Sequence, residues 1–151
     1  PYGLDMDDEG TLFVADMLNH RLVAWTSNAA AGELIIGKKG QGRGMDQLDQ
    51  PVMVMIERKT EHLILTEEAN RRVTRWSRRA GALGQLIIPD IVAGGIALDH
   101  EGSLYVSDFE KHEVRRYREG DQVGILVAGG YGRGDALNQF NCPRHLFVDR
   151  D

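Results

Sequence analysis

A β-hairpin motif that occurs three times constrains this chain more than any other feature. In its first copy, residues 11–15 and 20–25 are rich in strand-forming side chains, and a turn-forming segment with Asp16 and Asn19 separates them. The same order recurs at 62–76 and at 103–117. No stretch has the periodicity of an amphipathic helix, so the chain is predicted to be all-β.

The spacing of the three copies predicts the architecture. An acidic residue ends the first strand of each hairpin, at Asp16, Glu67 and Asp108, and these residues are 51 and 41 positions apart. Pro51 and Pro143 are 92 positions apart, which is the sum of one long and one short unit. Repeats of about 40–50 residues that each contain several short strands are typical of β-propellers.

Each unit holds four predicted strands, which is one propeller blade. We therefore expect a single propeller segment over residues 1–151, with blades at about 1–50, 51–92 and 93–142 and the innermost strand of a further blade at 143–151. One short helical turn is expected near 46–48.

The repeated residues resemble the NHL family, which is named for an Asn-His-Leu triplet. The resemblance is carried by Asn19-His20-Arg21-Leu22 and by two Gly-rich stretches, 37–44 and 129–134, each of which leads to a Pro that opens the next unit. It covers nearly the whole chain and implies a propeller, commonly of six blades, which needs more residues than this chain has.

Some units depart from the NHL pattern. The Arg that follows Asn-His is Arg21 in the first unit and Arg72 in the second, but Glu113 in the third. No Gly-rich stretch lies between Ile88 and Gly94. A binding surface built from the connections between blades is therefore expected to be uneven around the arc.

Two acid–arginine pairs lie across hairpin turns, Asp16 with Arg21 and Glu67 with Arg72. The NHL resemblance implies that each pair joins two strands of a blade by a charge-assisted hydrogen bond. We interpret these carboxylates as structural, and no catalytic residue is predicted.

Composition narrows the function classes. The net charge of −5 argues against a general nucleic-acid polycation. The single cysteine, Cys142, allows no intrachain disulfide. No apolar run approaches the ~18 residues that a membrane-spanning helix needs, so no membrane insertion is expected.

The leading functional hypothesis is a non-enzymatic binding or scaffold module that recognises a protein or peptide. Loops on a rigid scaffold are where recognition is usually carried. The predicted contacts lie in the connections between blades and comprise Lys38, Lys39, Arg43, Asp46, Tyr131, Arg133 and Asp135.

Two alternative functions remain open. The first is binding of single-stranded RNA by an Arg-rich face, as in some NHL propellers, here comprising Arg71, Arg72, Arg75, Arg78, Arg79, Arg115 and Arg116. The second is a metal-dependent lyase or hydrolase in the central funnel, using His145 and acids of the inner strands. No metal-ligand motif supports a metal site, and the Gly-rich stretches lack the Lys-Ser/Thr of a phosphate-binding loop, so no cofactor is predicted.

An arc of three blades has consequences for partners. It leaves unpaired strand edges and an apolar flank that other blades of a propeller normally cover. We expect either a longer parent chain that supplies those blades or a second copy that completes the ring. Trp25, Trp76 and Tyr117 share one repeat position and are predicted to lie in the core between blades.

Overall fold

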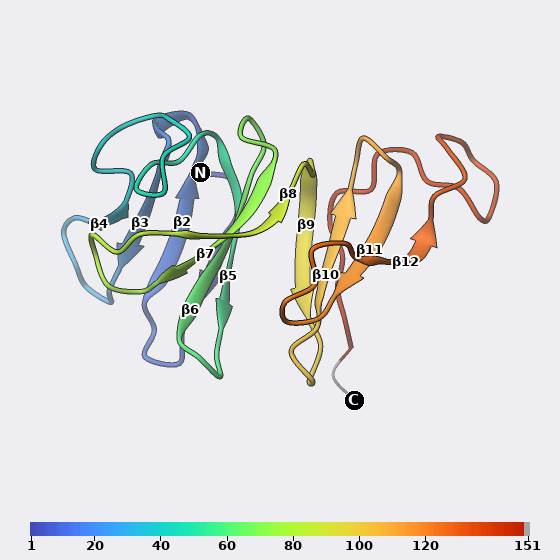
Figure 1. Ribbon diagram of the computed structural model, residues 1–151. Coiled ribbons are helices and arrows are strands. Elements are labelled where there is room, and N and C mark those ends of the chain that lie inside the picture. Colours follow the sequence, from blue (N-terminus) through green and yellow to red (C-terminus); the bar gives the residue numbers. More distant parts are fainter. Residues whose placement is uncertain (150–151) are drawn as a thin grey trace.

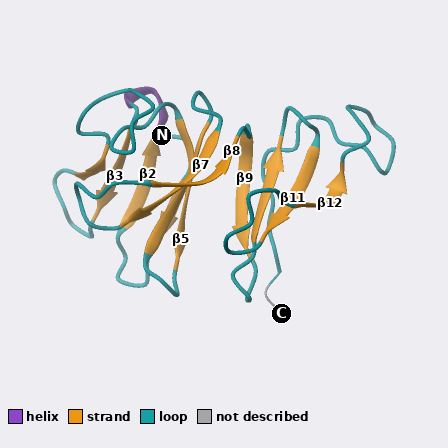
Figure 2. Ribbon diagram, viewed as in Figure 1, coloured by secondary structure: helices purple, strands orange, loops and turns teal. Residues whose placement is uncertain are grey.

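The computed structural model describes residues 1–149, which form three four-stranded antiparallel sheets (Figures 1 and 2). Within each sheet the strands follow one another in chain order. The first sheet contains β1 (Leu4–Met6), β2 (Leu12–Asp16), β3 (Arg21–Trp25) and β4 (Glu33–Ile36). The second contains β5 (Pro51–Glu57), β6 (His62–Glu67), β7 (Arg72–Ser77) and β8 (Gln85–Pro89). The third contains β9 (Ala93–Leu98), β10 (Leu104–Asp108), β11 (Glu113–Tyr117) and β12 (Ile125–Gly129).

The repeated hairpin forms the centre of each sheet, and its turn has the same geometry three times. Asp16 pairs with Arg21, Glu67 with Arg72 and Asp108 with Glu113 where the strands join. One residue before the second strand adopts a positive φ, at 52° in His20, 52° in Arg71 and 56° in His112. A single left-handed residue closes each turn and fixes the register, so the equivalence read from the spacing is confirmed.

The three sheets stand side by side as blades of a propeller in an open arc (Figure 1). The inner strand β5 contacts both β1 and β9, so the second blade lies between the first and the third. One core cluster joins the first two blades and includes Phe13, Leu48 and Trp76. A second cluster joins the second and third blades. The predicted all-β, partial-propeller fold is confirmed.

The predicted strand at the start of a fourth blade is not formed within the described residues, because 143–149 carry no strand. An innermost strand pairs with the second strand of its own blade, as β5 pairs with β6, and this segment has no such strand among residues 1–149. It still takes the place of an inner strand. A Cβ on Gly95 would meet the backbone of Arg144, just as a Cβ on Gly3 would meet the backbone of Val52.

The short turn expected near 46–48 is present at 44–47, where the Gln47 amide donates to the Gly44 carbonyl at 3.2 Å, but it is not helical. The helical element in the described chain is the short 3₁₀ turn η1 (Met17–Asn19). One further expectation was wrong. Trp25 is 40% exposed rather than in the core, because no other blade within residues 1–149 covers the face of the first blade on which it lies. No helix among the described residues has the length and apolar character needed to cross a membrane.

Candidate functional site

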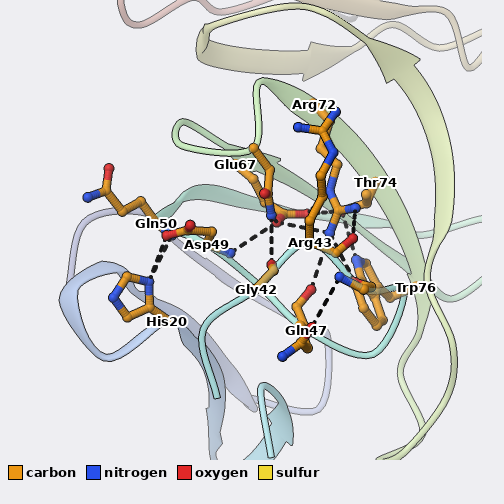
Figure 3. Close-up of polar contacts among 12 residues, drawn as sticks. His20, Gly42, Arg43, Gln47, Asp49, Gln50, Glu67, Arg72, Thr74 and Trp76 are labelled. Carbon is orange, nitrogen blue, oxygen red and sulfur yellow. Dashed lines mark hydrogen bonds and ion pairs between the residues drawn. The ribbon is translucent and has the colours of Figure 1, made fainter. Parts of the chain in front are cut away.

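A buried ion pair lies at the junction of the first and second blades (Figure 3). The Arg72 Nε donates to Glu67 Oε1 at 2.8 Å, and the two side chains are 4% and 0% exposed. The Thr74 hydroxyl and the Asn70 amide also donate to Glu67, at 3.1 and 2.6 Å. A buried carboxylate with this many donors is satisfied, and the expected structural role of the pair is supported by its geometry.

The same arginine holds the first Gly-rich loop, residues 37–50, against the second blade. Its guanidinium donates to the carbonyls of Arg43, Gly44 and Gln47, at 2.8, 3.3 and 3.2 Å. The loop's Leu48 is fully buried between the two blades. Loop 37–50 therefore acts as a plug that fills the junction.

The first blade carries the equivalent pair without such a loop. The Arg21 Nε donates to Asp16 Oδ2 at 2.7 Å, but the Arg21 side chain is 45% exposed. Hydrogen bonds from Asn19 and from Arg21 lower the pKa of Asp16 below its ordinary value. The expected charge-assisted hydrogen bond is present on a solvent-facing pair, and its structural role stays a prediction.

The junction between the second and third blades is built differently. Only residues 90–92 connect β8 to β9, so no loop carbonyls stand where an arginine could reach them. At the position of Arg72 the third blade has Glu113, which accepts a hydrogen bond from Arg115 Nε at 2.6 Å. The third blade thus lacks the arginine, and the connection that precedes it lacks the loop that such an arginine would bind.

Without a plug, this second junction contains a cleft of about 880 Å³. Tyr117 lines it, and Tyr117 occupies the repeat position of Trp76, which loop 37–50 helps to bury. The cleft lies between β8 and the third sheet, and its apolar lining comprises Ile56, Ile64, Leu86, Ile87, Ile88, Leu98 and Leu104.

Charges of both signs surround the cleft. Four cationic side chains, Arg58, Lys59, Arg75 and Arg118, and five carboxylates, Glu57, Asp99, Glu101, Glu119 and Asp121, contribute to its lining. Several are engaged already. Arg75 pairs with Glu57, and the Lys59 ammonium donates to the carbonyl of His100 at 2.8 Å. The arrangement suits a ligand with mixed polarity rather than a polyanion.

Two groups in the cleft have shifted pKa values. Burial raises the pKa of the Tyr117 hydroxyl, so this group stays protonated and able to donate a hydrogen bond. Burial also opposes ionisation of Asp99, but the hydrogen bonds that it accepts from Ser103, Glu101 and Gly102 outweigh this effect and lower its pKa. Asp99 is thus a charged residue that orders the β9–β10 turn.

Acidification should expose the contribution of Asp99. Because its pKa is lowered in the folded state, its contribution to stability is present above the unfolded value of 3.8 and is lost as pH falls through the lower folded value. Asp99→Asn should therefore lose less stability than the unmodified chain between about pH 7 and about pH 3. Thermal unfolding followed by circular dichroism at both pH values checks this, and an equal loss in the two proteins would contradict it.

The seven predicted contact residues lie on two separate loops. Lys38, Lys39, Arg43 and Asp46 belong to the first Gly-rich loop, where Lys39 pairs with Asp46. Tyr131, Arg133 and Asp135 are exposed on the second, residues 129–142. Figure 1 shows the two loops at opposite sides of the arc, so they form no continuous rim. A role in binding stays a prediction for both.

Most of the predicted Arg-rich face is engaged in ion pairs. Arg71 pairs with Asp90 and Glu110, Arg78 with Asp7 and Glu61, and Arg72, Arg75 and Arg115 with glutamates already described. Arg79 is exposed, and Arg116 has a buried Nε that meets no hydrogen-bond acceptor in the described structure. The seven side chains do not present seven free charges to a phosphate backbone.

His145 of the alternative metal site lies exposed in segment 143–149. Within residues 1–149, no three or more His, Cys, Asp or Glu side chains gather in a group that could hold a metal ion. Cys142 is free and exposed.

Apart from Arg75, which was assigned to the Arg-rich face, the sequence analysis predicted a binding role for none of the cleft residues. A signal for them was present, since the Gly-rich stretch is missing between Ile88 and Gly94. The consequence of that gap, an open space beside Tyr117, depends on how far two sheets stand apart, and periodicity alone does not give this distance.

Three antiparallel four-stranded sheets arranged blade by blade define the class: a segment of a β-propeller. Comparison with solved structures agrees. The chain is similar to a structural genomics protein of unknown function from Bacteroides thetaiotaomicron, with a TM-score of 0.76 and 15% identity over 98% of this chain and 42% of that one. It is also similar to virginiamycin B lyase from Staphylococcus aureus, solved with quinupristin, with a TM-score of 0.63 and 14% identity over 96% of this chain and 44% of that one.

A third similar structure is the extracellular domain of a candidate hybrid two-component system from Bacteroides thetaiotaomicron. Its TM-score is 0.68 at 10% identity, over 98% of this chain and 19% of that one. The chain thus spans less than half the length of each of these proteins. No protein-family model and no curated protein sequence matches the chain.

Proposed function

We propose that the chain is a non-enzymatic recognition segment of an NHL-type propeller that binds a peptide in the cleft between its second and third blades. The observation that carries this proposal is the unplugged junction. A cleft of about 880 Å³ with an apolar lining and polar groups at its edge falls within the size range of ligand sites. The NHL assignment is supported by the two Gly-rich loops and by the Asn-His-Arg turn.

A peptide fits this cleft better than other ligands do. Strand β8 is the outermost strand of its sheet, so one of its edges has backbone groups free to pair with an added strand. The apolar lining offers places for alternate side chains of such a strand. The balanced charges at the rim give no general attraction to nucleic acid. Similarity to the lyase at 14% identity shows the fold alone, so it does not favour an enzyme.

A matched pair of leucine variants tests the proposal. Peptides selected from a random library on the purified chain should bind Leu86→Asp at least about tenfold more weakly, because Leu86 lines the cleft and is 47% exposed. Leu83→Asp should bind them normally, since Leu83 is 71% exposed and lies outside the cleft. Fluorescence titration measures both affinities. Selected peptides that bind Leu86→Asp with unchanged affinity would overturn the proposal.

A further inference from the structure

The two walls of the cleft between the second and third blades differ in how many of their charges are already engaged. The second blade contributes the cations Arg58, Lys59 and Arg75. Arg58 pairs with Asp8 of the first blade, and Arg75 pairs with a glutamate of its own blade. The Lys59 ammonium donates to the His100 carbonyl at 2.8 Å. The cations of this wall are therefore held by neighbouring groups of the chain itself.

The third blade lines the cleft with carboxylates from two turns. Asp99 and Glu101 lie in the β9–β10 turn, and Glu119 and Asp121 lie in the β11–β12 turn. Arg118 is the single lysine or arginine in the sequence of these two turns. Four carboxylates thus stand against one arginine, and this wall of the cleft is anionic.

Two of these carboxylates are available to a ligand. Glu101 and Glu119 are exposed, and neither side chain has a hydrogen bond or an ion pair within residues 1–149. Asp99 and Asp121 instead accept hydrogen bonds from backbone amides of their own turns. Two unpaired negative charges therefore stand at the edge of an apolar cleft, on turns that the other two carboxylates keep in shape.

The complementary ligand is a cation attached to an apolar group. Within residues 1–149, the carboxylates of the cleft do not gather into a group of three that could hold a metal ion. The cation is better supplied by a larger ligand whose apolar part packs on Leu86, Ile88 and Tyr117. Complementary charge at the edge of a site selects the partner and fixes its orientation.

We propose that the cleft selects peptides in which a lysine or arginine flanks an apolar side chain. This inference rests on the proposed peptide-binding function and adds the charge of the ligand. The apolar side chain packs beside Leu86 and Tyr117, and the basic group pairs with Glu101 or Glu119. An acidic peptide would meet like charges at the same edge, so it is rejected.

Library selection on charge variants of the purified chain tests this preference. Random peptides that bind the unmodified chain should be enriched in Lys and Arg over Asp and Glu. Selection on Glu101→Lys/Glu119→Lys should reverse the preference, because a basic peptide then meets like charges. Glu9→Lys/Glu33→Lys is the control with the same net charge, and it should keep the preference for basic peptides, since both residues are exposed and lie outside the cleft.

Fluorescence titration with one selected basic peptide gives the size of the effect. Glu101→Gln/Glu119→Gln should bind this peptide about fivefold more weakly than the unmodified chain does. The difference should shrink at high salt, because both carboxylates are exposed and are screened by ions. Circular dichroism confirms that each variant is folded.

The outcomes separate this inference from the proposed function. Selected peptides that lose affinity for Leu86→Asp but show no basic preference would overturn the inference and leave the proposed function intact. So would a basic preference that Glu101→Lys/Glu119→Lys retains. A library that yields no binder, or binders indifferent to Leu86→Asp, would overturn the proposed function and this inference with it.

Discussion

Replacing Arg72 with alanine is expected to lower the free energy of unfolding by about 3–5 kcal/mol. The substitution leaves Glu67 with no charged partner in a site where its side chain is 0% exposed. It also removes the donor to three carbonyls of loop 37–50, so the plug between the first two blades loosens. Urea unfolding monitored by tryptophan fluorescence measures the change.

Arg21→Ala is the matched control, because Arg21 has the same place in its blade but is 45% exposed. It should cost no more than about 1 kcal/mol when measured at a concentration where the chain is monomeric. The double variant Glu67→Gln/Arg72→Met should be more stable than Arg72→Ala, because it leaves no unpaired charge buried at this site. Equal losses for Arg72→Ala and Arg21→Ala would show that burial does not distinguish the two pairs.

Trp76→Ala should also be severe, at about 3–5 kcal/mol, because it removes a large side chain that is 1% exposed in the first junction. The indole Nε1 donates to the Thr74 hydroxyl at 2.8 Å, and that hydroxyl in turn donates to Glu67. The cavity would therefore lie beside the buried ion pair. Thermal and urea unfolding of the variant test this expectation.

Trp25→Ala provides the comparison at the same repeat position. Trp25 is 40% exposed, so its loss should cost the monomer only about 1 kcal/mol. Trp76→Phe separates packing from the hydrogen bond, since it keeps most of the apolar volume but leaves Thr74 without its indole donor. A loss of stability for Trp25→Ala as large as that for Trp76→Ala would show that this face of the first blade is covered in solution.

The fold was largely predictable, because strand periodicity and turn residues are local properties. The hairpin at 11–25 and its two repeats could be read from residue types and spacing, and the resemblance to NHL repeats implied the ion pairs across the first two turns. Local sequence could not show whether the strand predicted at 143–151 forms, because a strand needs a neighbouring strand with which to exchange backbone hydrogen bonds. Segment 143–149 has a strand-like sequence and an inner-strand position, but no ladder partner within residues 1–149.

The site was harder to predict than the fold. Trp25 and Trp76 are identical residues at one repeat position. Trp76 is buried because the first blade and loop 37–50 pack against it, whereas no blade among residues 1–149 covers the face on which Trp25 lies. Likewise, Glu57 and Arg75 pair because β5 and β7 flank β6 in one sheet, and Arg78 pairs with Asp7 across the first junction. These contacts join distant parts of the chain, so the predicted Arg-rich face could not be distinguished from an ion-pair network by sequence alone.

The coupling of loop and arginine limits how such an array can gain or lose blades. A Gly-rich loop offers carbonyls to the blade that follows it, and only a blade with an arginine at the position of Arg72 can use them. The third blade has Glu113 there, so joining it directly to loop 37–50 would set a carboxylate against carbonyl oxygens. Removing the second blade alone would create this mismatch, whereas removing loop 37–50 together with the second blade would not. The loop and the blade that follows it are therefore expected to be inserted or deleted together.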